Sequence, residues 1–204
     1  MRKLLVLLFM VSGCSVSLLS QKITITSGTV DFLKNQKIIQ FVFTYEKMIV
    51  GKMTEAEYVE KKVTDYNKKE EERGDRWAKS WVTDRATRFV PKFIELFNKH
   101  MEKYNIVAGD NSSEGAEYRI VINTNFTEPG FNVGVVRKNA EIDLSCKVHN
   151  IATNEEVATV EIHNASANNF LGTDFDTGFR IQECYAKAGR ELAQFFIKKA
   201  NLKR

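Results

Sequence analysis

The sequence predicts an α+β fold, in which helices pack on one mostly antiparallel sheet and the elements follow in the order β-β-α-α-β-β-β-α. Segments rich in β-branched and aromatic residues lie on either side of a central region with helical apolar spacing, and a further helical apolar stripe closes the chain. The 204 residues are 43% hydrophobic and 27% charged, which excludes a disordered, collagen-like or multi-span membrane chain.

The first two strands are expected over residues 22–33 and 37–45, where β-branched and aromatic residues dominate. The polar residues Lys34, Asn35 and Gln36 separate them, so we expect the two strands to form a hairpin. Apolar residues occur on both faces of the second segment, which indicates an interior strand rather than an edge strand.

The central region is expected to hold two helices. Thr54 and Glu57 have the spacing of a capping box, and they begin a first helix that runs to about residue 73. The second helix runs from about residue 75 to residue 104. Pro91 should start, kink or split it, because proline removes a backbone N–H and clashes with the preceding turn.

Two tryptophans, Trp77 and Trp81, lie four residues apart on the second helix. The arginines around them are Arg73, Arg76, Arg85 and Arg88. We interpret the rings as a cover for the side of the core, with the arginine stems lying over them. The alternative interpretation is a surface that stacks on a ligand or a partner.

Three more strands are expected over residues 117–127, 140–148 and 156–163, where apolar and polar residues alternate. Residues 151–154 join the last two strands as a hairpin, and a final helix spans about residues 178–199. In the first of these strands the even-numbered Ile120, Ile122 and Phe126 are expected to face inward.

Residues 1–20 have the pattern of an export signal, with Arg2 and Lys3 before an apolar stretch too short to span a bilayer. The motif that ends at Cys14 resembles a bacterial lipobox, which predicts acylation of Cys14. The alternative is cleavage near Ser20, which would leave Gln21 first. Residues 21–204 are then a single exported α+β domain in the periplasm or at the outer membrane, lipid-anchored or soluble.

No catalytic, metal or cofactor site is predicted. The sequence lacks a G-x-S-x-G elbow, a P-loop and a G-x-G-x-x-G loop. His149 and His163 fall at opposite ends of neighbouring strands, too far apart for one metal ion, and His163 should lie beside Glu141. The acidic segment 174–178 departs from a calcium loop, so Asp174, Asp176 or Thr177 is expected to cap the last helix.

Cys146 and Cys184 are expected on the inward face of a strand and on the apolar stripe of the last helix, respectively. They can pair as a disulfide if their Cα atoms come within about 7 Å. The alternative is two separate buried thiols, and in neither case do we expect a catalytic cysteine.

A partner surface is predicted at the segment that links two of the strands. Phe131, Val133 and Val135 are odd-numbered, whereas the inward set that follows is even-numbered, so a bulge or loop must intervene. With Phe170 and Leu171 from a second loop, they would form an exposed apolar patch flanked by Arg137 and Lys138. The alternative is that both loops fold back over the end of the core.

The stretch 116–122, the strands at 139–150 and 156–163 and the helix from Ile181 together resemble uncharacterised secreted proteins of Bacteroidetes-type bacteria over residues 22–200. Over residues 84–200 they resemble more loosely the α/β domain of envelope lipoproteins, such as curli-secretion subunits and activators of penicillin-binding proteins. The helix at 54–73 departs from that pattern. The resemblance implies a periplasmic or membrane-attached domain that binds proteins or envelope components, and no catalytic residue is carried over with it.

The function expected from these features is that of an exported cell-envelope protein, acting as a non-enzymatic binding or assembly module. Its partner would be an envelope protein or a membrane component. A net charge of +4 gives no reason to expect nucleic acid. The alternative is a hydrolase, or a carrier of a small ligand or lipid, whose site forms only in three dimensions.

Overall fold

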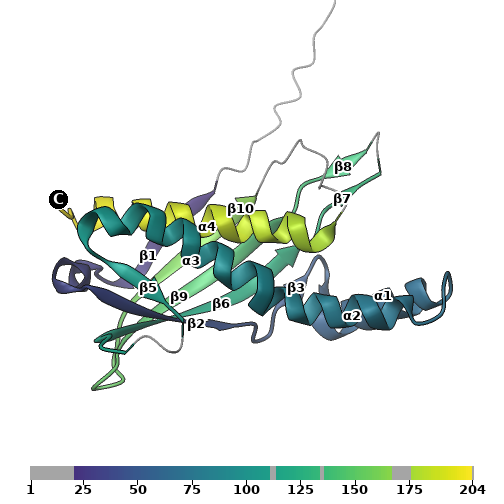
Figure 1. The fold of residues 1–204 in the computed structure, drawn as a ribbon, viewed down its shortest axis with the longest axis horizontal. Helices are drawn as coiled ribbons and strands as arrows, with labels where there is room; N and C mark the ends of the chain where they lie inside the picture. Colours follow the sequence, from purple (N-terminus) through teal and green to yellow (C-terminus); the bar gives the residue numbers. More distant parts are fainter. Residues whose placement is uncertain (1–20, 111–113, 134–135, 167–175, 204) are drawn as a thin grey trace, which may run out of the picture.

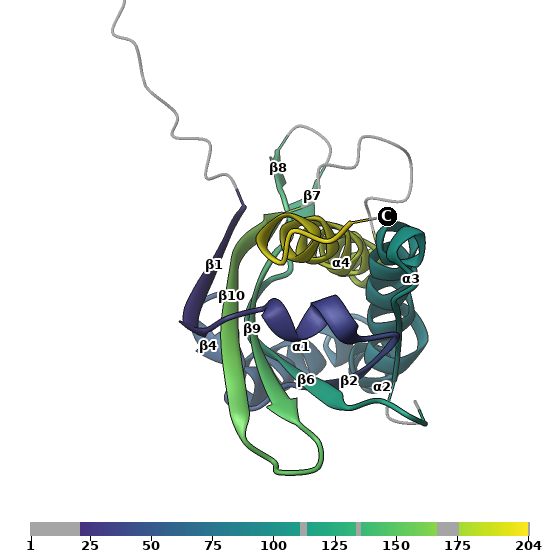
Figure 2. The same ribbon diagram turned by 90° about the vertical axis from the view of Figure 1, so that its left-hand side faces the viewer.

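The computed structural model describes residues 21–110, 114–133, 136–166 and 176–203. Within them the chain forms one mixed sheet with two long helices, α3 and α4, side by side across one face (Figure 1). Figure 2 shows that the sheet curves around these helices. The predicted α+β class is confirmed.

Six strands form the main path of the sheet, in the spatial order β1-β10-β9-β6-β2-β5, and the short strands β3 and β4 extend it beside β6. The strands of this sheet are β1 (Lys22–Gly28), β2 (Ile38–Thr44), β3 (Ile49–Val50), β4 (Met53–Thr54), β5 (Val107–Gly109), β6 (Tyr118–Glu128), β9 (Glu141–Asn150) and β10 (Glu156–Ser166). A separate two-stranded hairpin consists of β7 (Phe131–Asn132) and β8 (Arg137–Lys138).

The helical elements of the described residues follow the predicted succession of a central pair and a closing helix. They are α1 (Glu55–Asn67), α2 (Arg73–Asp84), α3 (Val90–Met101), α4 (Thr177–Lys199), the 3₁₀ turns η1 (Asp31–Asn35) and η3 (Glu102–Tyr104), and the π-helical turn η2 (Arg85–Phe89). Thr54 and Glu57 form the predicted capping box at the start of α1.

The predicted hairpin of the first two strands is wrong. β1 pairs antiparallel with β10 at one end of the sheet, whereas β2 lies parallel to β6 near the other end. The residues between β1 and β2 form η1 instead of a tight turn, and Val30 and Leu33 from this connection are buried in the core. Because these two side chains are buried, the connection packs on the core and does not form the tight turn that a hairpin requires.

The core lies between the sheet and the helices α3 and α4. Phe41 of β2 contacts Phe93 and Phe97 of α3 edge to face, with ring centroids 5.7 and 4.9 Å apart, an arrangement that aromatic quadrupoles favour.

Ile120 and Ile122 of β6 face this core as predicted, but a bulge between Thr124 and Phe126 reverses which residues of β6 point inward. Thr127 is therefore buried, and the prediction that Phe126 follows the same inward alternation is wrong.

The predicted second helix is divided into α2 and α3 by the π-helical turn η2, next to Pro91. A π turn contains one more residue than an α-helical turn. It can therefore accommodate a proline, which has no N–H to bond a carbonyl of the preceding turn. The aromatic stripe of α3 thus faces the sheet, while α2 pairs with α1 as an arm that extends beyond the sheet (Figure 1).

Candidate functional site

The described residues of the predicted partner surface lie on the β7–β8 hairpin, which projects from the body of the protein (Figures 1 and 2). Phe131 lies opposite Lys138 in its register, and the Val133 N–H donates to the Val136 carbonyl at 3.1 Å. At its base Gly130 has a φ of +63°, and a Cβ there would lie 2.5 Å from the Lys138 carbonyl oxygen. Only glycine therefore allows this close approach of the two strands.

Three apolar side chains of the hairpin are exposed. The exposed fraction is 42% for Phe131, 68% for Val133 and 54% for Val136. Of the other exposed large apolar residues in the described chain, Ile38 and Val107 lie opposite each other on β2 and β5, and the remaining ones are spread over different elements. Phe131 and Val133 were predicted to be exposed here, whereas Val136 was not among the predicted residues. Val135, Phe170 and Leu171, which belong to the predicted surface, lie outside the described residues.

Charged residues in and beside the hairpin are partly buried or bonded to other parts of the chain. Arg137 is half-buried, and the Lys138 ammonium forms an ion pair with Glu128. Arg180 of α4 is 93% buried, and its guanidinium donates to the carbonyls of Pro129 at 3.1 Å and Gly130 at 3.2 Å. The sequence does not predict this anchor, because a charged residue in an apolar helical stripe gives no sign of its backbone partners.

A second candidate site is a pocket of about 600 Å³ between α2, the end of α1 and the first turn of α4. The side chains of Trp77, Ser80, Trp81 and Asp84 line its α2 wall, and residues 176–178 of the α4 terminus face them. Ser80 is exposed and Trp77 is half-buried, so the pocket is open to solvent.

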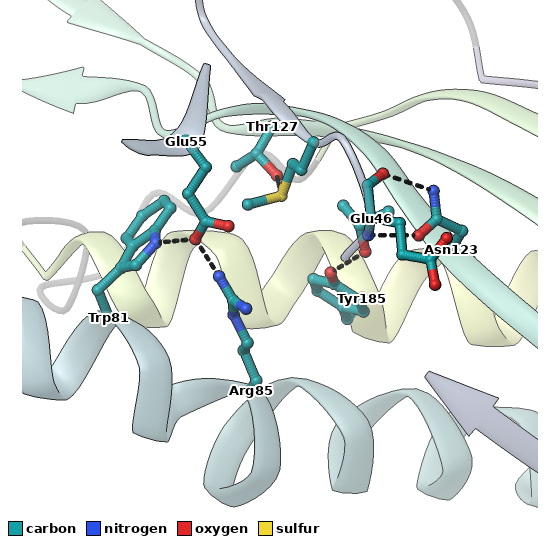
Figure 3. Close-up of polar contacts among 9 residues, drawn as sticks. Glu46, Glu55, Trp81, Arg85, Asn123, Thr127 and Tyr185 are labelled. Atoms are coloured by element: carbon teal, nitrogen blue, oxygen red, sulfur yellow. Dashed lines mark hydrogen bonds and ion pairs between the residues drawn. The ribbon is translucent and has the colours of Figure 1, made fainter. Parts of the chain in front are cut away.

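The aromatic wall of this pocket is built from two helices. Trp77 and Trp81 stack with ring centroids 5.5 Å apart, and Tyr66 of α1 meets Trp77 edge to face at 5.9 Å. The Trp81 indole N–H donates to the Glu55 carboxylate at 2.6 Å, and Arg85 pairs with the same carboxylate (Figure 3). The helices approach closely because Gly74 places no side chain against the Val63 carbonyl, 2.3 Å from where a Cβ would be.

Ion pairs form the polar wall of the pocket. Arg88 lies 3.1 Å from the carboxylates of both Asp84 and Asp176. Burial raises the pKa of Asp84, and Arg88 opposes that rise. Burial would also raise the pKa of Asp176, but the Phe179 N–H and Arg88 hold it below its usual range. Asp176 caps α4, as predicted for this segment, by accepting from the Phe179 N–H at 3.0 Å.

The two cysteines of the described chain are free thiols, and both are buried in the core. The Cys184 thiol donates to the Arg180 carbonyl at 3.4 Å. Burial raises the pKa of Cys146 far above its usual value, so this thiol stays protonated at neutral pH. Cys14 lies outside the described residues.

Within the described residues, no group of three His, Cys, Asp or Glu side chains could hold a metal ion. His163 lies 3.3 Å from Asp143 and not beside Glu141, because a bulge near the end of the β9–β10 pair shifts the register. In the same part of the chain, no helix is long and apolar enough to cross a bilayer.

The sequence matches no protein-family model and no curated protein. Among solved structures, a PelC dodecamer from Paraburkholderia phytofirmans shares 6% identity, covering 91% of this chain and 100% of that one, with a TM-score of 0.42. A homolog of a neuraminyllactose-binding hemagglutinin from Helicobacter pylori shares 12% identity over 82% and 89% of the two chains, with a TM-score of 0.37. A DUF330 protein from Xanthomonas campestris shares 14% identity over 52% and 58%, with a TM-score of 0.34. Similarities this low carry no residue and no activity over to this chain.

Proposed function

We propose that the protein is an exported cell-envelope protein that acts as a non-enzymatic binding module and docks on a membrane surface through its β7–β8 hairpin. One observation carries the proposal: Phe131, Val133 and Val136 are exposed together on an element that projects from the body. Exposed apolar side chains gathered in this way are typical of a contact surface rather than of ordinary solvent exposure.

The position of the start of β1 supports a membrane as the partner. The start of β1 and the hairpin lie on the same side of the molecule in both views (Figures 1 and 2). The segment from Cys14 to Gln21 reaches at most about 25 Å when extended. An acyl anchor on Cys14 would therefore hold this side of the domain, and the hairpin with it, close to the bilayer.

The expected free energies of membrane binding favour a role for the anchor and the hairpin together. Full burial of a valine or phenylalanine side chain stabilises by roughly 1.5–3 kcal/mol, so three partly exposed ones supply on the order of 3 kcal/mol. A bacterial lipoprotein anchor carries several acyl chains and binds firmly, and by holding the hairpin at the bilayer it would make this weaker apolar contact effective. Because Lys138 is paired with Glu128, we expect apolar contact to contribute more than attraction to anionic lipids.

Replacement of Cys14 by serine tests the anchor. We expect Cys14→Ser to move the full chain, expressed with its own leader, from the membrane fraction to the soluble fraction. Mass spectrometry of the unchanged protein should find an acylated cysteine at the mature amino terminus. A mature terminus at Gln21 would contradict the anchor but would leave the hairpin proposal standing.

The hairpin is tested separately in the Cys14→Ser background, where it is the remaining membrane contact that we propose. We expect Phe131→Ser with Val133→Ser to lower partition into phosphatidylethanolamine–phosphatidylglycerol vesicles at least about tenfold in flotation assays. The melting temperature should change little. Val82→Ser is the matched control, since Val82 is 58% exposed on α2.

Two results would contradict membrane docking. One is vesicle binding that the double variant leaves unchanged. The other is a large loss of stability in the double variant, which would show that the hairpin side chains pack on the core. Loss of capture of a specific envelope protein, without any binding to vesicles, would identify a protein partner instead.

A further inference from the structure

We propose that the pocket beside α2 binds a neutral oligosaccharide, with a sugar ring lying on Trp77 and its hydroxyl groups bonding to the ion pairs of the opposite wall. This site is separate from the hairpin, and the inference does not depend on the proposed membrane contact. It takes up the alternative interpretation of Trp77 and Trp81 as a stacking surface.

The aromatic wall is a fixed platform. Trp81 is 94% buried, it stacks beneath Trp77, and the Glu55 carboxylate holds its indole N–H (Figure 3). Trp77 is half-buried, so part of this ring remains open to the pocket. The face of an indole ring carries negative potential, which attracts the weakly positive C–H groups on the face of a sugar ring.

The polar wall suits hydroxyl groups, each of which donates and accepts a hydrogen bond. Arg88 offers N–H donors directly beside the acceptor oxygens of Asp84 and Asp176. Both carboxylates and the guanidinium are partly exposed, so they have further bonding capacity toward the pocket. Because the ion pairs already fix these side chains, a ligand would order few additional groups when it binds.

The charge of the site disfavours an anionic ligand. Arg88 is shared by two carboxylates, and Arg73 and Arg76 both pair with Glu70. The three arginines around the pocket are thus matched by three carboxylates, without the surplus that a phosphate or a polyanion requires. The amino terminus of α4 is likewise not available to an anion, because the Asp176 carboxylate already accepts a hydrogen bond from the Phe179 N–H there.

The size and openness of the site favour a chain of sugars over a single small molecule. A volume of about 600 Å³ is within the range of small-molecule sites. The exposed Arg76 and Ser80 border it, so a ligand chain could continue past the pocket into solvent.

The test titrates the full chain with cellohexaose, maltohexaose and the hexamer of N-acetylglucosamine, and follows tryptophan fluorescence and heat of binding. Oligogalacturonate and inorganic phosphate are the anionic probes. We expect saturable binding of at least one neutral hexamer and much weaker binding of both anions. Absence of binding by all three neutral hexamers at millimolar concentration would overturn the proposal, as would a preference for the anions.

Variants on α2 place the binding in this pocket. We expect Trp77→Ala to weaken affinity at least about tenfold, and Trp77→Phe to restore part of it, because phenylalanine keeps an aromatic face. Ser80→Ile fills the pocket with a stiff side chain and should also weaken binding, so the test does not depend on removal of a packed ring.

Two controls complete this test. Val82→Ser lies on the same helix and should bind as the unchanged protein does. The hairpin double variant should bind the hexamer normally, so failure of the membrane proposal would be distinguishable from failure of this one. Full affinity in both Trp77→Ala and Ser80→Ile would overturn the site.

Discussion

Replacement of Phe97 by alanine is expected to lower the free energy of unfolding by about 3–5 kcal/mol. The Phe97 side chain is fully buried, and its ring centroid lies 4.9 Å from that of Phe41 and 6.2 Å from that of Phe196. Its removal would leave a cavity between the sheet, α3 and α4, since rigid neighbours on three elements cannot all move inward.

Thermal and denaturant unfolding measure this effect. For a domain of this size the melting temperature should fall by roughly 6–20 °C. Val82→Ala is the control, because an exposed substitution of this kind usually changes stability by less than about 0.5 kcal/mol. A loss below about 1 kcal/mol in Phe97→Ala would mean that α3 does not pack on the sheet as described.

Gly189 is expected to be the most sensitive small residue of α4, and Gly189→Val should destabilise the protein by about 3 kcal/mol. A Cβ at this position would lie 2.3 Å from the Phe93 carbonyl oxygen and 3.0 Å from its carbon, and both are backbone atoms of α3. Glycine is a poor helix former, and its replacement relieves up to about 1 kcal/mol of that penalty. The clash outweighs this gain, because α3 could move only by opening the core.

Equilibrium denaturation of Gly189→Val beside Gln194→Val separates the two effects. Gln194 is exposed on the same helix, so its replacement reports the helix propensity of valine without any clash. No loss of stability in Gly189→Val would show that α3 and α4 do not cross at Gly189.

The sequence was informative wherever one local pattern determines one element. The alternation in residues 140–148 and 156–163 and the apolar stripe of 178–199 predicted β9, β10 and α4, because each buries one face against a single layer. The prediction is wrong at residues 34–36, whose polar side chains favour a tight turn. Strand pairing is set by the tertiary core, and nothing near those residues reveals that Leu33 is buried.

The candidate sites could likewise be predicted only where residues close in sequence carry the signal. The change of parity across residues 136–139 indicated an irregular segment where the hairpin lies, since parity is a property of neighbouring residues. The spacing of Trp77 and Trp81 marked one wall of the pocket. The other wall comes from Asp176 and the start of α4, distant in sequence and brought beside α2 only by the packing of helices. Buried partners such as Arg180 leave no local signal.

The pairing of β1 with β10 has a consequence for the order in which the protein folds. Lys22, among the first residues of the domain to leave the ribosome, lies opposite His163, which is made near the end of synthesis. Until then the hydrogen-bonding edge of β1 has no partner, and contacts this distant in sequence form slowly. The sheet is therefore completed only after β10 has been made, and until then the open edge of β1 is a place where strands from different chains can associate.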